Sequence, residues 1–242
     1  MLRASQFKLL TVQTVLFTPD SQAFTQADFL RHILARHAKR YDGQLQTFAL
    51  PNDAPPELPR IVLQSKDGNH KLQAAPARID ALWIYHPDSS GDDALISHAK
   101  VLSDYLRDSS VRVGRVALVL NWACDCPNPD EALIEKFCSN TARETQFRGS
   151  RGFEIHNLKN YELRSAGRVV NSWVRCRTGR LSTKDNPTER DAVLLEQDIN
   201  TPLEQVYEYA FTAESITEFF RATKEEAESI LKLYFPEEVN SQ

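Results

Sequence analysis

The order of strand-like and helix-like segments occurs twice along this chain, and this repeat constrains the fold more than any single motif does. Residues 7–17 are rich in β-branched and aromatic side chains and predict a strand. Thr25 caps residues 26–41, whose apolar side chains recur at helical spacing. The remaining segments of this half are expected at 60–65, 70–75 and 78–85 as strands and at 94–107 as a helix.

The second half repeats this order. Asp130 caps an expected helix at 131–139 and Thr212 caps one at 213–221, while Thr223 opens a capping box for a separate helix that ends at Tyr234. Strands are expected at 113–122, 153–164, 168–177 and 192–199. We therefore predict an α+β fold of two similar strand-helix-sheet-helix halves, with antiparallel sheets covered by helices. The N-terminal half is expected at 1–110 and the C-terminal half, with an acidic helical tail, at 111–242.

Turn residues mark the connections between these segments. Four prolines in residues 51–59 exclude a helix or a central strand there and predict a surface connection. Asp67-Gly68 favours positive φ and predicts a hairpin, and residues 165–167 are expected to join two further strands.

The composition excludes several classes of protein. The 242 residues are 41% hydrophobic and 26% charged, with 8 Gly and 12 Pro, which rules out wholesale disorder and collagen-like folds. No apolar run approaches the roughly 18 residues of a membrane span, and the first residues lack the apolar segment of a secretory leader. We therefore expect a cytoplasmic protein without a membrane partner.

Motifs of several enzyme classes are missing. The chain contains no G-x-x-x-x-G-K-[ST], G-x-G-x-x-G, G-x-S-x-G or H-E-x-x-H pattern. We therefore expect no cofactor, and the sequence favours a non-enzymatic protein. The remaining catalytic candidates are Glu154 and His156, which share one face of an expected strand. That spacing permits general acid–base chemistry and equally permits a surface ion pair.

Three cysteines are the candidates for a metal site. Cys124 and Cys126 are separated by a single residue, Cys138 lies on an expected helix that could approach them, and His156 could complete the set. Zinc sites generally place two to four residues between paired ligands and use a second pair elsewhere. Because no second pair is present, we expect reduced structural thiols and no bound metal.

The net charge of −4 conceals a segregation of charge along the chain. Residues 1–142 hold 15 basic and 16 acidic residues, 143–190 hold 11 and 5, and 191–242 hold 3 and 12, which gives −1, +6 and −9. Either the basic middle and the acidic tail face each other across the fold, or the basic part meets a polyanion while the tail stays in solvent. The sequence leaves both interpretations open.

The basic segment contains an expected strand with two unlike faces. One face carries small, core-like side chains: Val170, Ser172, Val174 and Cys176. The other face carries Trp173, Arg175 and Arg177, which could stack on bases and contact phosphates, with Arg148 and Arg151 extending the surface. In the alternative interpretation Trp173 is buried beneath a helix and the arginines pair with the acidic C-terminal segment.

Several short motifs resemble those of a known family. Residues 59–68 read Pro-Arg-Ile-Val-Leu-Gln-Ser-Lys-Asp-Gly and precede Pro76-Ala77-Arg78, while Asp198-Ile199-Asn200 precedes helical residues that include Phe219, Thr223 and Glu226. This combination resembles a family of sporadically distributed, functionally uncharacterised prokaryotic proteins of about this length, in which a serine stands where this chain has Ala75. The resemblance implies a two-part α+β fold with no established activity, and a distribution associated with mobile or defence-linked genes.

Three hypotheses about function follow. The first is a non-enzymatic binding or assembly module that recognises a protein partner or a second copy of itself. The second is an RNA- or DNA-binding protein that uses the arginine-rich segment at 143–190. The third is a hydrolase or nuclease that uses Glu154 and His156. We expect the position of Trp173 to discriminate between the first two.

Overall fold

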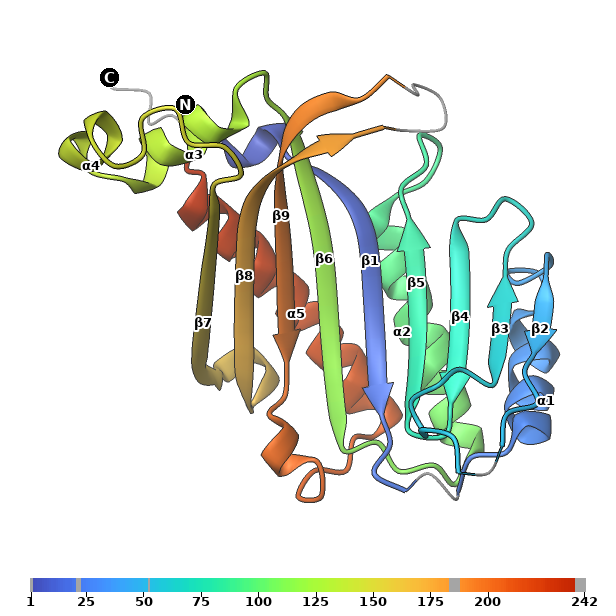
Figure 1. The fold of residues 1–242 in the computed structure, drawn as a ribbon. Coiled ribbons are helices and arrows are strands. Elements are labelled where there is room, and N and C mark those ends of the chain that lie inside the picture. The colour runs from blue at the N-terminus through green and yellow to red at the C-terminus, as the bar shows by residue number, and fades with distance from the viewer. Residues whose placement is uncertain (1, 21–22, 52, 183–187, 238–242) are drawn as a thin grey trace.

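Nine strands form one antiparallel sheet in the computed structural model, which describes residues 2–20, 23–51, 53–182 and 188–237. The strands lie side by side in the order β2-β3-β4-β5-β1-β6-β9-β8-β7 (Figure 1). Their bounds are β1 Lys8–Phe17, β2 Leu45–Thr47, β3 Ile61–Gln64, β4 His70–Ala75, β5 Arg78–Ile84, β6 Arg115–Asp125, β7 Glu154–Leu163, β8 Arg168–Leu181 and β9 Arg190–Asn200. The predicted α+β class is therefore confirmed.

The long helices lie on one face of this sheet, behind the strands as Figure 1 is drawn. The α-helices are α1 Gln26–His37, α2 Gly91–Asp108, α3 Pro129–Phe137, α4 Asn140–Glu144 and α5 Ala213–Tyr234, and the short 3-10 helices are η1 Ala4–Gln6, η3 Arg164–Ala166 and η4 Leu203–Gln205. Helices α2 and α5 pack against each other and against the central strands. None of the helices in the described residues is both long and apolar enough to cross a bilayer.

Alternation along the strands explains why helices cover only one face. On β1, Val12 and Leu16 point toward the helices and are almost fully buried. They belong to one buried cluster with Trp83 on β5, which lies directly opposite Val12, and with Phe219 and Phe220 of α5. Burying an aromatic or aliphatic side chain of this size stabilises the fold by roughly 2 kcal/mol. These contacts form the main core between sheet and helices.

The two expected halves share this single sheet, because the first strand of each half lies at its centre. Strand β1 pairs with β6 in antiparallel register, with Val12 opposite Leu120 and Leu16 opposite Val116. The expectation of a separate sheet for each half is therefore corrected. Both β1 and β6 are long apolar strands whose backbone groups need hydrogen-bonding partners on both sides. Each supplies one of the two neighbours of the other, and β5 and β9 supply the remaining ones.

A second, smaller core joins the two ends of the chain. The backbone N–H of Ala4 donates to the carbonyl of Phe235 at 2.8 Å, and the rings of Phe7 and Phe235 lie 4.5 Å apart. Leu133 of α3 and Cys176 of β8 pack into the same cluster. The end of the C-terminal helix is therefore anchored to the residues that lead into the first strand of the sheet.

One continuous helix, α5, replaces the two helices expected at the C-terminus. The capping box forms at Thr212, whose side chain accepts from the N–H of Ser215. Thr223 instead lies fully buried within the helix, where its hydroxyl donates to the carbonyl of Phe219 at 2.8 Å. A threonine inside a helix can satisfy its hydroxyl in this way, so the T-x-x-E pattern did not mark a helix start.

Smaller differences concern segment ends. Helix α1 stops at His37, earlier than expected, and Tyr41 beyond it is buried in the main core. Asn128 takes the N-cap position of α3, while the carboxylate of Asp130 accepts from the N–H of Phe153 at 2.7 Å. The short elements β2 and α4 were not expected, because three to five residues carry too little periodicity to be recognised.

Candidate functional site

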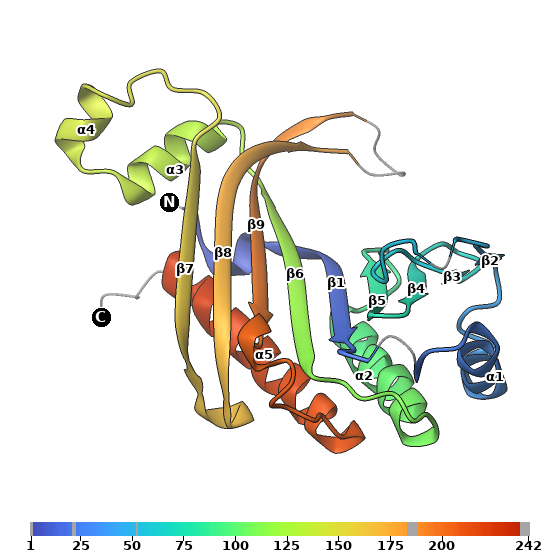
Figure 2. The ribbon, with the colours of Figure 1, turned by 60° about the horizontal axis from the view of Figure 1, so that its bottom comes forward.

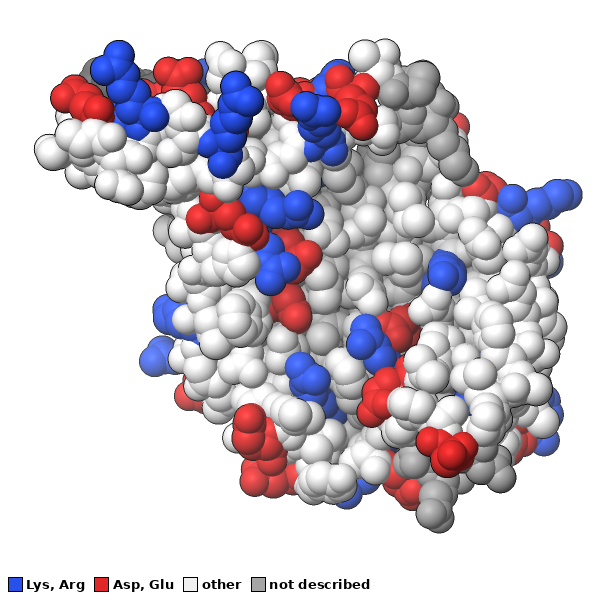
Figure 3. Space-filling view, viewed as in Figure 1, with Lys and Arg blue, Asp and Glu red and all other residues white. Residues whose placement is uncertain are grey.

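The face of the sheet opposite the helices is uncovered by any helix of the described residues, and we call it the open face (Figure 1). Its principal side chains come from six strands. They are Gln13 and Phe17 of β1, Arg78 and Asp80 of β5, Arg115 and Val119 of β6, Glu196 and Asp198 of β9, Trp173, Arg175 and Arg177 of β8, and Glu154, His156 and Leu158 of β7. Figure 3 shows this face hollowed near its centre, where the surface carries few charges, with acidic and basic side chains intermixed beside the hollow.

The hairpin of β8 and β9 shapes one side of this hollow. Figure 2 shows the two strands bending at one end, away from the plane of their neighbours, so that they stand over the open face on the side toward β5. Gly179 of β8 pairs with Ala192 of β9, and a Cβ at position 179 would lie 2.5 Å from a methyl of Leu194. A side chain at position 179 would therefore require that of Leu194 to shift.

Trp173 lies on the open face and is 42% exposed. It is directly opposite Leu158 on β7 and Asp198 on β9, and Leu158 is itself half exposed. The opposite face of β8 carries the buried Val170, Ser172, Val174 and Cys176, as the alternation predicted. The ring therefore faces solvent, and the interpretation that placed it beneath a helix is wrong.

The two arginines beside Trp173 have different surroundings. Arg175 lies between two carboxylates, with its Nη1 3.3 Å from Oε1 of Glu196 and its Nε 3.6 Å from Oε1 of Glu154. Arg177 is exposed and has no ion-pair partner among the described residues. One of these two guanidinium groups is therefore neutralised by its neighbours, and the other is free to contact an anion.

Glu154 and His156 form an ion pair on the same face, with 2.6 Å between Oε1 and Nε2. Both side chains are exposed, at 39% and 46%, and they lie on the edge strand β7. Exposed pairs of this kind are worth at most about 1 kcal/mol. The two side chains lie on one face of the strand, as the spacing predicted, and both are open to solvent.

Arg148 and Arg151 lie in a groove beside the end of β8 that follows Arg177. They line a groove of about 1180 Å³ between α3, α4 and the bent end of β8, together with Arg180, Asp130 and Asp191. Arg180 is held there by Glu189 at 3.1 Å and Asp191 at 3.7 Å. Arg148 and Arg151 therefore lie beside the end of β8, beyond Arg177, and their contribution to the face of Trp173 stays a prediction.

The three cysteines proposed as metal ligands do not converge. Cys124 and Cys126 are buried in the second core with Cys176, while Cys138 is the C-cap of α3. Burial raises the pKa of Cys124 to about 11 and that of Cys176 to about 12, which disfavours the thiolate that a metal requires. Among the described residues no three His, Cys, Asp or Glu side chains are grouped to hold a metal ion.

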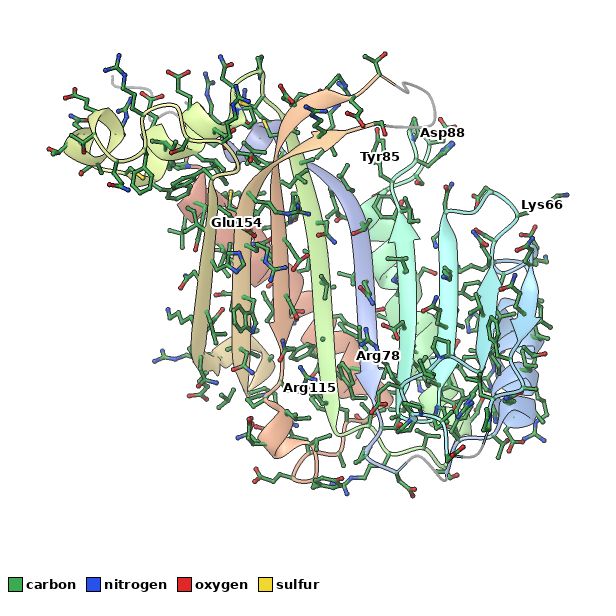
Figure 4. All side chains as sticks on the ribbon, viewed as in Figure 1. Lys66, Arg78, Tyr85, Asp88, Arg115 and Glu154 are labelled. Carbon is green, nitrogen blue, oxygen red and sulfur yellow. The ribbon has the colours of Figure 1, made fainter. Side chains whose placement is uncertain are left out.

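A cluster that sequence reasoning missed lies at the lower end of the open face (Figure 4). The guanidinium groups of Arg78 and Arg115 both lie over the ring of Phe17, at 5.2 and 4.4 Å from its centre. Arg78 also pairs with Asp80 at 2.6 Å. The three residues come from β5, β6 and β1, so only the strand order could have brought them together.

The basic and acidic segments of the chain are neighbours in the sheet. Strand β8 carries much of the basic charge and pairs with β9, which opens the acidic segment. Arg175–Glu196 and Arg180–Asp191 are ion pairs between the two. Some of the basic and acidic side chains of the two segments therefore pair with each other within the sheet. Among the described residues, Arg148, Arg151 and Arg177 have no such ion pair.

Comparison with known proteins adds little to this geometry. No family model matches the chain, and no curated protein matches it. Among solved structures, the TBP of Methanococcus jannaschii is similar over 91% of this chain and 99% of its own, with 11% identity and a TM-score of 0.28. A TM-score this low supports no conclusion about fold family or function.

Proposed function

We propose that this protein is a non-enzymatic module that binds single-stranded nucleic acid on the open face of its sheet. The observation that carries the proposal is the position of Trp173, whose indole is exposed on the open face. Arg177, which has no ion-pair partner among the described residues, lies on the same face of β8. Tryptophan is enriched at interaction sites, because its ring offers a large apolar surface together with a polar N–H.

The chemistry of this surface fits an unpaired base better than a duplex. Every nucleobase has a flat π-face that can stack on an indole, and such stacking is worth about 1–3 kcal/mol per base. A base within a duplex is already stacked on both sides, so only a single strand can offer one to Trp173. Leu158, opposite Trp173, widens the apolar platform on which a base would rest.

Phosphate contacts would come from the guanidinium groups on either side of this platform. Arg177 lies toward the bent end of β8, and Arg115 lies toward the lower end of the open face, where Arg78 is already paired with Asp80. Burial lowers the pKa of Arg115, and its Nε donates to the carbonyl of Thr201 at 2.8 Å, which fixes its orientation. A strand crossing the open face would therefore meet cations before and after the stacking platform.

The test is a binding titration with labelled single-stranded RNA and DNA oligonucleotides at several salt concentrations. We expect log Kd to rise linearly with log salt, and the slope to fall by about 0.7 when Arg177 becomes Gln, because one phosphate contact is lost. Arg221→Gln is the matched control, since that exposed residue lies on α5, away from the open face, and pairs with Glu225. An equal loss of affinity in both variants would contradict the proposal.

A protein partner is the second candidate, and one observation favours it. Strand β7 ends the sheet, is ten residues long and is exposed along most of its length, so its outer backbone groups face solvent. An extended segment of a partner, or β7 of a second copy, could add to this edge by backbone hydrogen bonds. Concentration-dependent sedimentation together with slowed amide exchange in β7 would support this function in place of nucleic-acid binding.

We do not propose catalysis. Glu154 and His156 remain a hypothesis for hydrolase or nuclease activity, whose test is metal-dependent turnover that disappears in His156→Ala. The exposed setting of that pair favours the role of a surface ion pair.

We also propose that the halves at 1–110 and 111–242 arose by duplication, in line with the resemblance to the sporadically distributed prokaryotic family and its mobile or defence-linked setting. Outward from the centre the strands read β1, β5, β4, β3 and the short β2 on one side and β6, β9, β8, β7 on the other. Each half then ends in a long helix, α2 or α5, on the same face. This symmetry of order supports a common origin.

A further inference from the structure

A second pocket lies at the far edge of the molecule from Trp173, where the end of α1, the β3–β4 turn and α2 meet. Its volume is about 570 Å³, within the range of small-ligand sites. The charged and titratable side chains that line it are Arg36, His37, Lys39, Arg40, Asp42, Lys66, Asp67, His70 and Lys100. Lys66, at the tip of the β3–β4 turn, is labelled in Figure 4.

Positive charge in this pocket is only partly compensated. Arg36 pairs with Asp108, and Lys100 pairs with Asp104 at 2.8 Å. The side chains of Lys39, Arg40 and Lys66 have no carboxylate partner among the described residues. These three cations share the pocket with the carboxylates of Asp42 and Asp67, so this group of five keeps one positive charge in excess.

The two carboxylates that line the pocket are engaged in holding its loops. Oδ1 of Asp42 accepts from the backbone N–H of Lys66 at 2.9 Å. Oδ1 of Asp67 accepts from the hydroxyl of Ser65 at 2.5 Å and from the N–H of Asn69 at 2.9 Å. These bonds fix the β3–β4 turn beside the chain that follows α1, so the pocket is built by interactions that do not involve its cations.

Arg40 is positioned by a neutral partner. Its Nη1 lies 3.3 Å from Nε2 of His70, and burial together with this guanidinium lowers the pKa of His70, so the ring is neutral near pH 7. Behind it, the ring of His98 lies 6.1 Å from that of His70, fully buried and without a hydrogen-bond partner for either nitrogen. The imidazole thus orients Arg40 without cancelling its charge, and the remaining N–H groups of the guanidinium can donate to a ligand.

We infer that this pocket binds the phosphate group of a small phosphorylated molecule, held by Arg40 with Lys39 and Lys66. A phosphate carries up to two negative charges and several acceptor oxygens, so it can satisfy one guanidinium and two ammonium groups at once, whereas a carboxylate offers a single charge. The pocket is remote from the open face, and this site is independent of nucleic-acid binding at Trp173.

The experiment titrates inorganic phosphate and adenosine monophosphate into the full chain while the ring resonances of its six histidines are followed by NMR. We expect the His70 resonance to shift in a saturable way with either probe. Arg40→Gln should weaken binding by about tenfold or more, as expected for a lost charge-assisted pair. Arg31→Gln, which removes an exposed arginine of α1 paired with Asp28, should change it less than twofold.

Other results would overturn the inference. No shift of His70 at millimolar phosphate, or equal weakening by Arg40→Gln and Arg31→Gln, would show that the pocket is not an anion site. Binding of an oligonucleotide that depends on Arg40, without binding of either small probe, would assign the pocket to nucleic-acid phosphates instead. If Arg40→Gln fails to fold, the exposed Lys66→Gln gives the same comparison, with about threefold weaker binding expected because one of three cations is lost.

Discussion

Arg175 on β8 lies directly opposite Glu196 on β9, and 3.3 Å separates Nη1 of the arginine from Oε1 of the glutamate. This pair joins the basic segment of the chain to the acidic one. The net charge of −4 is therefore a poor guide to what the protein binds, because part of the opposite charge is paired within the sheet. The relevant groups are the cations left without a partner, such as Arg177.

Arg175 and Arg177 should respond differently to substitution. We expect Arg177→Gln to weaken oligonucleotide binding without changing the free energy of unfolding, since Arg177 has no described partner. Arg175→Gln should destabilise the fold by less than about 1 kcal/mol, because the pair with Glu196 is more than 40% exposed on both sides. Urea denaturation and fluorescence anisotropy measure the two effects. The reverse pattern would mean that Arg177 is structural.

His98 should make stability depend on pH. Burial lowers its pKa to about 3, whereas the unfolded side chain titrates near 6.5, so the unfolded state binds more protons between these values. The contribution of neutral His98 to the free energy of unfolding is complete above pH 6.5. It is lost as the pH falls toward 3, at up to about 1.4 kcal/mol per pH unit.

The substitution His98→Leu isolates this effect. Neither ring nitrogen has a hydrogen-bond partner, so we expect the variant to be at least as stable as the parent at pH 7. Its advantage should grow at pH 5, because only the parent gains a proton on residue 98 when it unfolds. Urea denaturation at the two pH values tests this, and an advantage that shrinks at pH 5 would refute the buried neutral histidine.

The cysteines should differ in reactivity. Burial raises the thiol pKa of Cys124 to about 11 and of Cys176 to about 12, so both should react slowly with iodoacetamide at pH 8. Cys138 is partly exposed and should be alkylated first. Mass spectrometry after timed labelling checks the order. If added zinc protected Cys124 and Cys126 from alkylation, that result would support a metal site at these cysteines.

Gly114 tests how the chain leading into β6 is packed. A Cβ at this position would lie 1.8 Å from the carbonyl oxygen of Val206, so Gly114→Ala must displace the segment after β9. We expect a loss of more than about 2 kcal/mol. At Gly167, φ is +58° but space is open, so Gly167→Ala should cost only about 1 kcal/mol. Thermal melts should show a larger drop in Tm for Gly114→Ala than for Gly167→Ala.

Local patterns predicted most strands, because alternation and turn chemistry act within a few residues. The alternation at Val170 to Cys176 correctly separated the buried face of β8 from that of Trp173. The turn at Asp67-Gly68 has positive φ at Gly68, as expected, and residues 165–167 join two strands, as expected, with positive φ at Gly167. By contrast, the single helix α5 was missed, since Thr223 bonds within the helix and the capping pattern alone cannot reveal this.

The parts of the candidate site that were missed depend on strand order. Phe17, Arg78 and Arg115 meet only because β5, β1 and β6 are neighbours, and no spacing in the sequence encodes that pairing. The pocket at Arg40 and His70 likewise needs the end of α1 beside the β3–β4 turn. Long-range pairing is set by the packing of the whole sheet, which one sequence does not show.

The fluorescence of Trp173 tests the central claim most directly. Of the three tryptophans, Trp83 is fully buried and Trp122 donates its N–H to Gln197 on the helix side at 2.8 Å, so only Trp173 is exposed on the open face. We predict that a short single-stranded oligonucleotide quenches the emission in a saturable, salt-sensitive way, and that Trp173→Ala abolishes the quenching and weakens binding by about five- to a hundredfold. Tyr207→Ala, which removes an exposed aromatic ring from the loop after β9, should leave both unchanged. Binding with unaltered Trp173 emission, or equal affinity in Trp173→Ala, would contradict the account.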